Sequence, residues 1–595
     1  MSTMLKRTHH CGQLRDTDAG STATVAGWVN SYRDHGGVIF IDLRDREGLT
    51  QLVFHPENKE AHDLADKLRN EDVIAATGKV VPRAEGMANP KLATGAIEVD
   101  CDTLEILNKA ETPPFTPDEA GKVGEAQRLK YRYLDLRRPA MQKILRTRHR
   151  VTKIMRDYFD EEGFYEVETP FLCRSTPEGA RDFLVPSRLH AGSFYALPQS
   201  PQLFKQILMV AGLEKYVQIV RCFRDEDPRA DRQAEFTQLD LEMSFVDQDD
   251  VMNTVEGLVR RIWKQVADID VPPVQRMTYA EAMDRFGSDR PDLRFSMELI
   301  DVTDLASQTE FKVFTGSIAA GGQVKAIRVP GGATLTRKQT DGLAEWVKQF
   351  GAGGLPICKV ENGTVATGVA KFIEPIAGAL IEKLGADDGD LICFGVSDKK
   401  SVVARVLGEL RVKLAHELKM IEPGQWKWLW VVDFPLIEYN DEQKRWDSLH
   451  HPFTAPSDED LALLESDPGA VRSKAYDLVL NGSELGGGSI RIHSPQVQQK
   501  IFNLLGIDDE AAKAKFGFLL DALKFGAPPH GGLAIGLDRM VMHLCGTTNI
   551  RDVIAFPKTQ NGADLMTEAP STVDLAQLDE LSLRVQTHHA PDKAV

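Results

Sequence analysis

The segment from residue 221 to residue 245 constrains the fold of this chain more than any other. It reads RCFRDEDPRADRQAEFTQLDLEMSF, which is typical of two strands around a charged turn. After Phe236, polar and apolar residues alternate with the period of a strand. The polar positions are Gln238, Asp240, Glu242 and Ser244, and the apolar positions are Leu239, Leu241, Met243 and Phe245. We therefore expect one solvent-facing polar face and one face on a hydrophobic core.

A second arginine-bearing motif, GGLAIGLDRM, lies far along the chain at residues 531–540. Its apolar run from Leu533 to Leu537 predicts a strand that leads into a helix. Arg539 falls in the first turn of this helix, and Gly546 ends it. Because helix N-termini favour anions, the two motifs together indicate a nucleotide site without a phosphate loop.

A chain of 595 residues is too long for a single core, so we expect three or four domains. The net charge of −17 argues against a general nucleic-acid binder. The sequence has no apolar signal stretch, and no uncharged apolar run approaches the roughly 20 residues that span a bilayer. Seven scattered cysteines without a CxxC pair favour reduced thiols over zinc sites or disulfides. We expect a cytoplasmic protein without membrane contact.

The acidic charge is unevenly distributed, because a basic stripe lies between residues 126 and 150. It consists of Arg128, Lys130, Arg132, Arg137, Arg138, Lys143, Arg146, Arg148 and Arg150. A solvated helix face is the ordinary interpretation of such a run. The stripe begins just after a linker, however, and contact with the phosphates of a large polyanion is the alternative.

Turn residues and changes in composition divide the chain into segments. Five short strand patterns predict a small barrel such as an OB-fold, and a proline-rich acidic linker follows. An amphipathic helix from residue 141 ends at Gly163, and glycine-rich turns between the two arginine motifs indicate an insertion. The predicted segments are 1–107 (barrel), 108–140 (hinge), 141–285 and 415–560 (two parts of a central domain), 286–414 (insertion) and 561–595 (C-terminal extension).

Seven short motifs in order resemble those of one enzyme family. GFYEVETP, FRDED with Phe236 following, and GLAIGLDR are similar to motifs 1, 2 and 3 of class II aminoacyl-tRNA synthetases. TPEGARD (176–182), QSPQLFKQ (199–206), LHHPF (449–453) and GGGSIRIH (486–493) narrow the resemblance to bacterial-type aspartyl-tRNA synthetases. The resemblance implies a multidomain α+β fold: an OB barrel, an antiparallel class II sheet with flanking helices, and an inserted domain like that of tRNA-dependent amidotransferases.

The resemblance also implies ATP as co-substrate and an aspartyl-adenylate intermediate. A carboxylate attacks the α-phosphate while pyrophosphate leaves, so anions must be positioned and no protein nucleophile is needed. Arg224 would hold the α-phosphate and the attacking carboxylate, while Arg539 would hold the γ-phosphate and stack on adenine opposite Phe236. The other implied ATP-binding positions are Asp225, Glu226, Gln233, Glu484, Gly536, Leu537 and Asp538, with Mg²⁺ held by Asp477 and Glu484.

Charge predicts how aspartate would be selected. Its side-chain carboxylate should meet Arg491 and Lys205, with Asp240 as their counter-charge. Asparagine would point an NH₂ group at those donors, and mispaired buried groups can give discrimination on the order of 10⁴-fold. The other implied aspartate-binding residues are Glu178, Ser200, Gln202, Arg224 and His450. Gly179 would let the TPEGARD loop close over the substrate.

The barrel would bind the anticodon, because aromatic and guanidinium surfaces on OB-folds stack on splayed bases. Arg33, Phe40 and Gln51 match family positions that read the anticodon. His35 and Gly86 resemble the pair found in members that charge both tRNA(Asp) and tRNA(Asn). A non-discriminating enzyme is therefore expected, which would make Asp-tRNA(Asn) for later amidation by an amidotransferase.

Several alternatives stay open. An aspartyl enzyme specific for tRNA(Asp) is one. Lysyl- and asparaginyl-tRNA synthetases share the barrel and core, but a lysine pocket needs an acidic end. A non-catalytic tRNA-binding scaffold is opposed by the intact arginine motifs, and an amidotransferase subunit is suggested by the insertion alone. A homodimer is expected by resemblance, since motif 1 typically packs across a two-fold axis.

Overall fold

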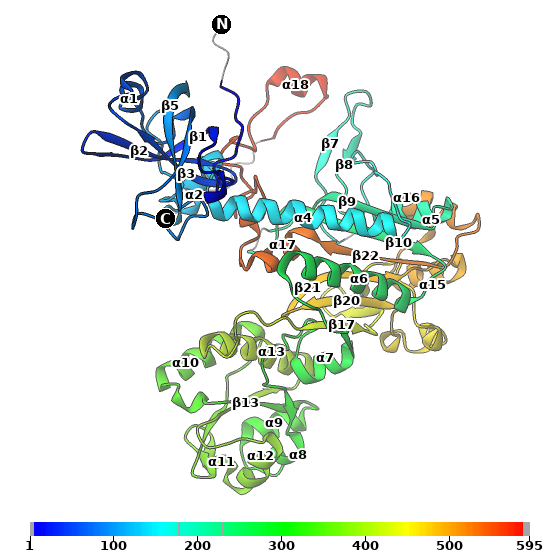
Figure 1. Ribbon diagram of the computed structural model, residues 1–595. Helices are drawn as coiled ribbons and strands as arrows, with labels where there is room; N and C mark the ends of the chain where they lie inside the picture. Colours follow the sequence, from blue (N-terminus) through cyan, green and yellow to red (C-terminus); the bar gives the residue numbers. More distant parts are fainter. Residues whose placement is uncertain (1–4, 177–178, 228–229, 587–595) are drawn as a thin grey trace. The chain divides into compact units, whose positions relative to one another are not determined.

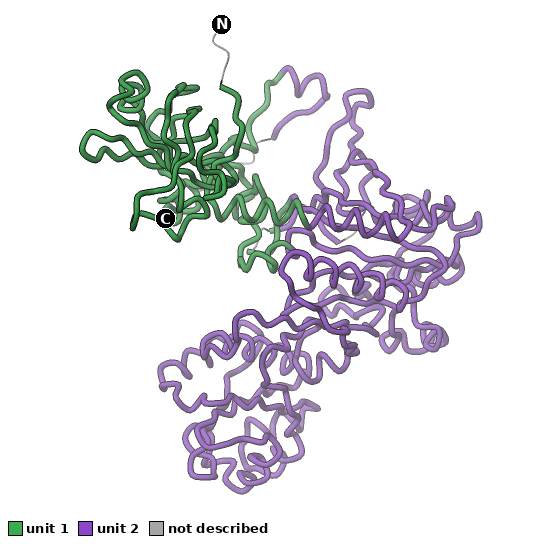
Figure 2. The backbone as a smooth tube through the Cα atoms, in the orientation of Figure 1, with its two compact units in different colours: residues 1–150, 227–234, 541–575 green, residues 151–226, 235–540, 576–595 purple. Residues whose placement is uncertain are grey.

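The computed structural model describes residues 5–176, 179–227 and 230–586 (Figure 1). The chain forms two compact units (Figure 2). Unit 1 contains residues 1–150, 227–234 and 541–575, and unit 2 contains residues 151–226, 235–540 and 576–595. No helix among the described residues is long and apolar enough to cross a membrane.

Unit 1 contains a closed five-stranded barrel, which confirms the OB-fold prediction. The strands join in the order β1-β2-β3-β5-β4. Ile39, Ile41 and Leu43 of β2 point into the barrel core, whereas Phe40 and Asp42 lie on its outer side. The barrel elements are β1 Thr22–His35, β2 Val38–Asp45, β3 Gly48–Phe54, α1 Lys59–Ala65, β4 Val73–Pro82 and β5 Ile97–Asn108.

The hinge contains the short helices α2 (Glu125–Lys130) and α3 (Arg132–Asp135), and three arginines of the basic stripe form contacts within unit 1. The Arg132 side chain is buried, and it donates hydrogen bonds to Asp135 at 2.5 Å and to three backbone carbonyls between residues 551 and 555. Arg138 lies 2.7 Å from the same carboxylate, and Arg137 lies 2.6 Å from Glu71. Arg132 is thus an internal residue of unit 1, so neither a solvated helix face nor contact with a polyanion describes it. For the partly exposed Arg137 and Arg138, contact with a polyanion stays a prediction.

Unit 2 is built around an eight-stranded sheet with the order β11-β17-β20-β21-β22-β10-β9-β6. Within the described part of this sheet, only the outer pairs β11/β17 and β6/β9 are parallel. The GFYEVETP segment contributes just two paired residues, because β6 is a short edge strand. The strands are β6 Tyr165–Glu166, β9 Lys215–Phe223, β10 Glu235–Ser244, β11 Gln275–Thr278, β17 Trp428–Val432, β20 Ala475–Leu480, β21 Ser483–Ile490 and β22 His530–Gly536.

The predicted solvent-facing side of β10 is in fact buried. Asp240 and Glu242 are 1% and 0% exposed, because cations from other elements cover them. Phe245, predicted to lie on the core face, is 70% exposed. The strand ends at Ser244 and Phe245 adopts φ +60°, which turns its side chain away from the sheet.

Helices cover the sheet of unit 2 (Figure 1). On α6, Val251, Val255 and Ile262 are fully buried, and α6 packs on α4 through the Tyr158 hydroxyl, which donates to the Thr254 carbonyl at 2.8 Å. The α4 helix begins two residues before the predicted start and ends before Gly163. The helices are α4 Pro139–Glu161, α5 Gln202–Val210, α6 Gln248–Ala267, α7 Tyr279–Phe286, α14 Leu463–Ser466, α15 Pro495–Leu504, α16 Asp509–Leu523 and α17 Leu537–Cys545, with a short α18 at Leu575–Glu580.

Residues between α7 and β17 form a second sheet with the order β12-β13-β16-β14-β15 and separate hydrophobic clusters on its helices. This part corresponds to the predicted insertion. Its strands are β12 Ile300–Asp301, β13 Gln323–Val329, β14 Ile357–Glu361, β15 Thr364–Ala366 and β16 Leu391–Ser397. Its helices are α8 Thr303–Ala306, α9 Lys312–Ala319, α10 Arg337–Trp346, α11 Ala370–Ile373, α12 Ala377–Leu384 and α13 Lys400–Glu417. Two small hairpins, β7 Leu184–Pro186 with β8 Phe194–Ala196 and β18 Ile437–Asn440 with β19 Arg445–Ser448, complete unit 2.

Candidate active site

A pocket of about 600 Å³ lies in unit 2, above the polar side of β10. Its walls come from α5, β20, β21, β22 and the loop that contains LHHPF. The sequence separations are large, yet ten of the residues predicted to bind aspartate, ATP or metal meet here. Those that line the pocket are Ser200, Gln202, Lys205, Arg224, Glu226, Asp240, His450, Asp477, Glu484 and Arg491.

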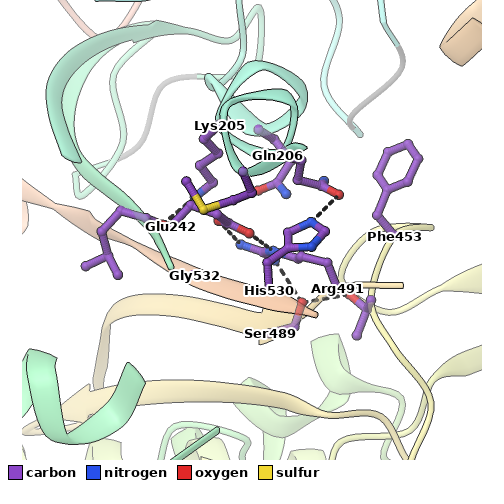
Figure 3. A network of polar contacts seen from close by, with 12 residues as sticks. Lys205, Gln206, Glu242, Phe453, Ser489, Arg491, His530 and Gly532 are labelled. Carbon is purple, nitrogen blue, oxygen red and sulfur yellow. Dashed lines mark hydrogen bonds and ion pairs between the residues drawn. The ribbon is translucent and has the colours of Figure 1, made fainter. Parts of the chain in front are cut away.

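Arg491 is the centre of a buried ion network (Figure 3). Its guanidinium donates to both carboxylate oxygens of Glu242, at 2.9 and 3.1 Å, although Asp240 was the predicted counter-charge. One Nη1 hydrogen goes to the Ser489 hydroxyl and the other to His451 Nε2, both at 2.8 Å. A guanidinium has five N–H donors, so these four contacts, which are those with described residues, leave one for a ligand.

Lys205 projects from α5 into the same network and is 1% exposed. Its Nζ donates to Asp240 Oδ1 at 3.0 Å and lies 3.5 Å from Glu242 Oε2. Asp240 Oδ2 and Gln202 Nε2 are buried and lack a hydrogen-bond partner among the described residues. Because an unsatisfied buried polar group costs about 1–3 kcal/mol, one acceptor and one donor are available here for a polar ligand.

The charges at this end of the pocket favour an anion. Burial opposes ionisation of Glu242, but Arg491 and Lys205 outweigh it and lower the pKa of Glu242. Burial raises the pKa of Asp240 despite Lys205. Lys205, Arg224 and Arg491 are thus three cations around two carboxylates. A ligand carboxylate would therefore enter a region with a net positive charge.

His451 was not among the predicted site residues, and it is a buried acceptor in this network. Burial and the charge of Arg491 hold its pKa well below the usual value near 6.5. The ring is therefore neutral at physiological pH, and its Nε2 lone pair faces the Arg491 Nη1 donor. The sequence offered one signal, since His451 follows His450 within LHHPF.

Two carboxylates meet at another wall of the pocket. Asp477 on β20 and Glu484 on β21 approach each other across Gly487, where a Cβ would lie 2.5 Å from Asp477 Oδ1 and 3.5 Å from Glu484 Oε1. Burial and the Asp477 charge raise the pKa of Glu484. His450 Nε2 lies 3.5 Å from Asp477 Oδ1, and the two acids raise the pKa of His450 although burial opposes this.

These two acids fit a divalent cation that takes most of its ligands from elsewhere. Asp477 Oδ1 is buried without a hydrogen-bond partner among residues that the structure describes. The described residues contain no cluster of three or more metal-ligating side chains. Mg²⁺ commonly binds one or two carboxylates and completes its shell with substrate phosphates and water. A cation here would remove the repulsion between Asp477 and Glu484.

The two arginine motifs lie beside this acidic wall and the cationic end. The Arg224 guanidinium lies over the Phe236 ring, 5.1 Å from the ring centroid. Arg539, in the first turn of α17, donates from Nη1 to the Glu484 carbonyl oxygen. The strands of the two motifs belong to one sheet of unit 2, since β10 pairs with β22.

Other predicted ATP-binding residues occupy different surroundings. Asp538 is buried and accepts a hydrogen bond from the Thr237 amide at 2.8 Å, and the Leu537 side chain is 1% exposed. The Asp225 carboxylate lies 3.8 Å from Arg181.

Gly536 ends β22, and a Cβ at this position would lie 3.6 Å from the Arg539 Cβ, in ordinary contact. Gln233 belongs to unit 1, where it accepts from the Lys558 amide, and Glu178 lies outside the described residues.

The predicted anticodon residues cluster on the outer side of the barrel in unit 1. Arg33 pairs with Phe40 across the β1/β2 ladder. The Arg33 guanidinium donates to Asp42 at 3.1 Å and to Gln51 Oε1 at 3.3 Å. His35 is exposed at the end of β1, and Gly86 has φ +78° with open space around it. An aromatic ring beside hydrogen-bonding groups suits an unstacked base.

Two family descriptions match the chain. Residues 124–560 match tRNA synthetases class II (D, K and N), and residues 23–107 match the OB-fold nucleic acid binding domain. The chain therefore belongs to the class II tRNA synthetases of the D, K and N group. It is 57% identical over 584 residues to an aspartate--tRNA(Asp/Asn) ligase of Halothermothrix orenii, covering 98% of this chain and 99% of that protein. An aspartate--tRNA ligase of Halalkalibacterium halodurans is 54% identical over 594 residues, with 99% and 100% covered.

Solved structures of the same class share the fold. An asparaginyl-tRNA synthetase from Pyrococcus horikoshii superimposes with a TM-score of 0.59 at 20% identity, covering 93% of this chain and 99% of that chain. A putative aspartyl-tRNA synthetase from Leishmania major gives the same TM-score at 19% identity, covering 93% and 95%. The barrel and the class II sheet are thus common to proteins with different amino-acid substrates.

Proposed function

We propose that this protein attaches L-aspartate to tRNA in an ATP-dependent reaction through aspartyl-adenylate, and that it charges both tRNA(Asp) and tRNA(Asn). The buried cationic end of the pocket carries the proposal. Counting contacts with described residues only, Arg491 keeps one free donor, and Asp240 and Gln202 keep an unpaired acceptor and donor. Lys205 lies beside them. The names of the relatives, which are 53–57% identical over nearly the whole chain, support the same reaction.

Aspartate would bind with its side-chain carboxylate at Arg491 and Lys205. Its α-ammonium group would then lie toward Ser200, Gln202 and the loop that contains Glu178. Asparagine would place NH₂ hydrogens against donor groups, because a guanidinium and an ammonium cannot accept a hydrogen bond. Glu242, rather than Asp240, fixes the orientation of Arg491, since it takes two of the guanidinium donors.

ATP would lie between the arginine motifs. Arg224 would stabilise the charge that develops at the α-phosphate as the aspartate α-carboxylate attacks, and adenine would stack on Phe236. Arg539 would bind the γ-phosphate, which leaves together with the β-phosphate as pyrophosphate. Asp477 and Glu484 would hold Mg²⁺, which neutralises phosphate charge when bound. The other proposed members of the ATP site are Asp225, Glu226, Gln233, Gly536, Leu537 and Asp538. The buried Leu537 and Asp538 would contact ATP through their backbone.

The barrel would then select the tRNA. Arg33, Phe40 and Gln51 would contact the anticodon, and His35 with Gly86 would permit tRNA(Asn). The chain would consist of the six predicted segments, with residues 286–414 as the inserted domain. A homodimer in the cytoplasm that passes Asp-tRNA(Asn) to an amidotransferase would complete it, because that product must be amidated before use in protein synthesis.

Charging and exchange assays test the proposal. The purified protein is expected to incorporate labelled pyrophosphate into ATP only with aspartate, and to aspartylate both tRNAs. Arg539→Ala should lower the exchange rate on the order of 10²-fold, because a fixed positive charge at the leaving phosphate is lost. Charging of tRNA(Asp) alone would favour the discriminating alternative. No exchange in the parent protein would favour the scaffold alternative.

Gly487→Ala tests the cation site. The added methyl group would overlap the Asp477 carboxylate at 2.5 Å and displace it. We expect the Mg²⁺ concentration for half-maximal exchange to rise roughly 10-fold or more, as when a group that supports a metal ligand is altered. Gly517→Ala on α16 is the control, because its Cβ would meet only Lys513 at 3.5 Å. An unchanged Mg²⁺ requirement in Gly487→Ala would count against Asp477 as a ligand.

A further inference from the structure

The turn that carries His35 is held by a neighbouring helix. β1 and β2 are joined by Gly36 and Gly37, which have φ +65° and +86°, as in a tight hairpin turn with two left-handed residues. Residues 33–37 are all exposed, so packing does not fix them. Two consecutive glycines also give the turn a large conformational freedom. Its conformation therefore depends on the few hydrogen bonds that reach it.

Two of these bonds connect the hairpin with α1. His62 Nε2 lies 2.8 Å from the Gly37 carbonyl oxygen, and because a carbonyl only accepts, the histidine donates. The Tyr32 hydroxyl donates at 3.2 Å to Oδ1 of Asp66, the residue that follows the last residue of α1. A third bond, from the Gly37 amide to Asp34 Oδ1 at 3.0 Å, stays within the hairpin. His62 is thus the α1 side chain that holds the turn itself.

The helix is a firm support for this contact. Asn58 accepts from the Ala61 amide at the helix N-terminus, and its Nδ2 donates to the Asp102 carbonyl of β5 at 2.6 Å. Ala61 and Ala65 are 2% and 0% exposed in the barrel core. The barrel core therefore fixes the position of the His62 imidazole, and the hydrogen bond of the imidazole to the Gly37 carbonyl restrains the turn.

We propose that His62 is a positioning residue for tRNA selection, which holds the Gly37 carbonyl and thereby orients His35 toward the anticodon. The inference rests on the proposed role of His35 in accepting tRNA(Asn). His62 itself would not contact the substrate. Loss of its hydrogen bond would let the Gly36–Gly37 turn move, and His35 would spend less time in the orientation that tolerates tRNA(Asn).

Charging kinetics of full-length His62→Ala with both tRNAs test this role. We expect kcat/KM for tRNA(Asn) to fall about fivefold, mainly through KM, the effect of about one hydrogen bond. The value for tRNA(Asp) should change less than about twofold. His62→Gln keeps an N–H donor at similar reach and should restore most of the loss. Asp63→Ala, an exposed neighbour on α1, is the control and should leave the ratio of the two tRNAs unchanged.

Hydrogen exchange of the peptide over residues 33–40 gives an independent readout, and it should be faster in His62→Ala and close to the parent in His62→Gln. Equal losses on both tRNAs, an unchanged ratio, or no rescue by glutamine would overturn the positioning role while the proposed function stands. A parent protein that charges tRNA(Asp) alone would instead overturn the proposed tolerance of tRNA(Asn), and the role of His62 in it.

Discussion

Arg491→Met is expected to reduce aspartate-dependent pyrophosphate exchange on the order of 10³-fold, because truncating one partner of a buried charge pair costs about 2–5 kcal/mol. The substrate carboxylate would lose its donor, and Glu242 would be left buried without its main counter-charge. Arg491→Lys keeps the charge but loses the fork that binds two oxygens, so it should recover only part of the activity. Exchange rates at saturating ATP and varied aspartate measure the effect.

Stability must be separated from substrate binding in this experiment. The double variant Arg491→Met with Glu242→Gln removes the stranded charge, so it should regain thermal stability without regaining activity. Arg411 is a matched control, a fully buried arginine that donates to the Met297 and Asp292 carbonyls and does not line the pocket. Arg411→Met should lower the melting temperature and leave the KM for aspartate unchanged. Recovery of exchange in the double variant would contradict a substrate role for Arg491.

Arg224→Ala should lower kcat for pyrophosphate exchange by roughly 10²–10³-fold, the loss seen when one donor to a developing charge is removed. The fold should tolerate the change, because the side chain lines the pocket over Phe236 instead of supporting the core. Steady-state exchange at saturating ATP and aspartate measures kcat, and thermal unfolding checks the fold.

Arg221 is the matched control for Arg224. It lies on β9, three residues earlier, forms an ion pair with Glu235, and does not line the pocket. Arg221→Ala should therefore change exchange by less than about threefold, as expected when an exposed ion pair is lost. Equal losses in the two variants would mean that the segment needs its charge or its fold in general, and Arg224 would have no special place in the reaction.

The fold was largely predictable from the sequence, whereas the partners of buried charges were not. Alternation after Phe236 correctly predicted β10, and Leu533 to Leu537 correctly predicted most of β22. Alternation alone cannot tell a solvated polar face from a buried one, since both have period two. Burial of Asp240 and Glu242 depends on cations 35 and 249 residues away in the chain.

The identity of the counter-charge shows the same limit. Asp240 and Glu242 are two residues apart and project to the same side of β10, so spacing gives no reason to prefer either as the partner of Arg491. The choice follows from register, because Glu242 lies opposite Gly532 on β22, where a side chain would collide with its carboxylate. The family resemblance pointed to the residues that line the pocket. It did not predict that the Asp538 carboxylate accepts a hydrogen bond from the Thr237 amide.

The strand order of unit 2 bears on how the protein is made. β22 lies between β10 and β21, although about 300 residues separate β10 from β22 in the chain. During synthesis β10 therefore emerges from the ribosome with one edge unpaired and with Glu242 lacking Arg491. Such long-range pairing forms late and exposes unpaired strands meanwhile. We expect that a nascent chain cannot bind aspartate until β22 has emerged, and that the half-made sheet needs protection from aggregation until then.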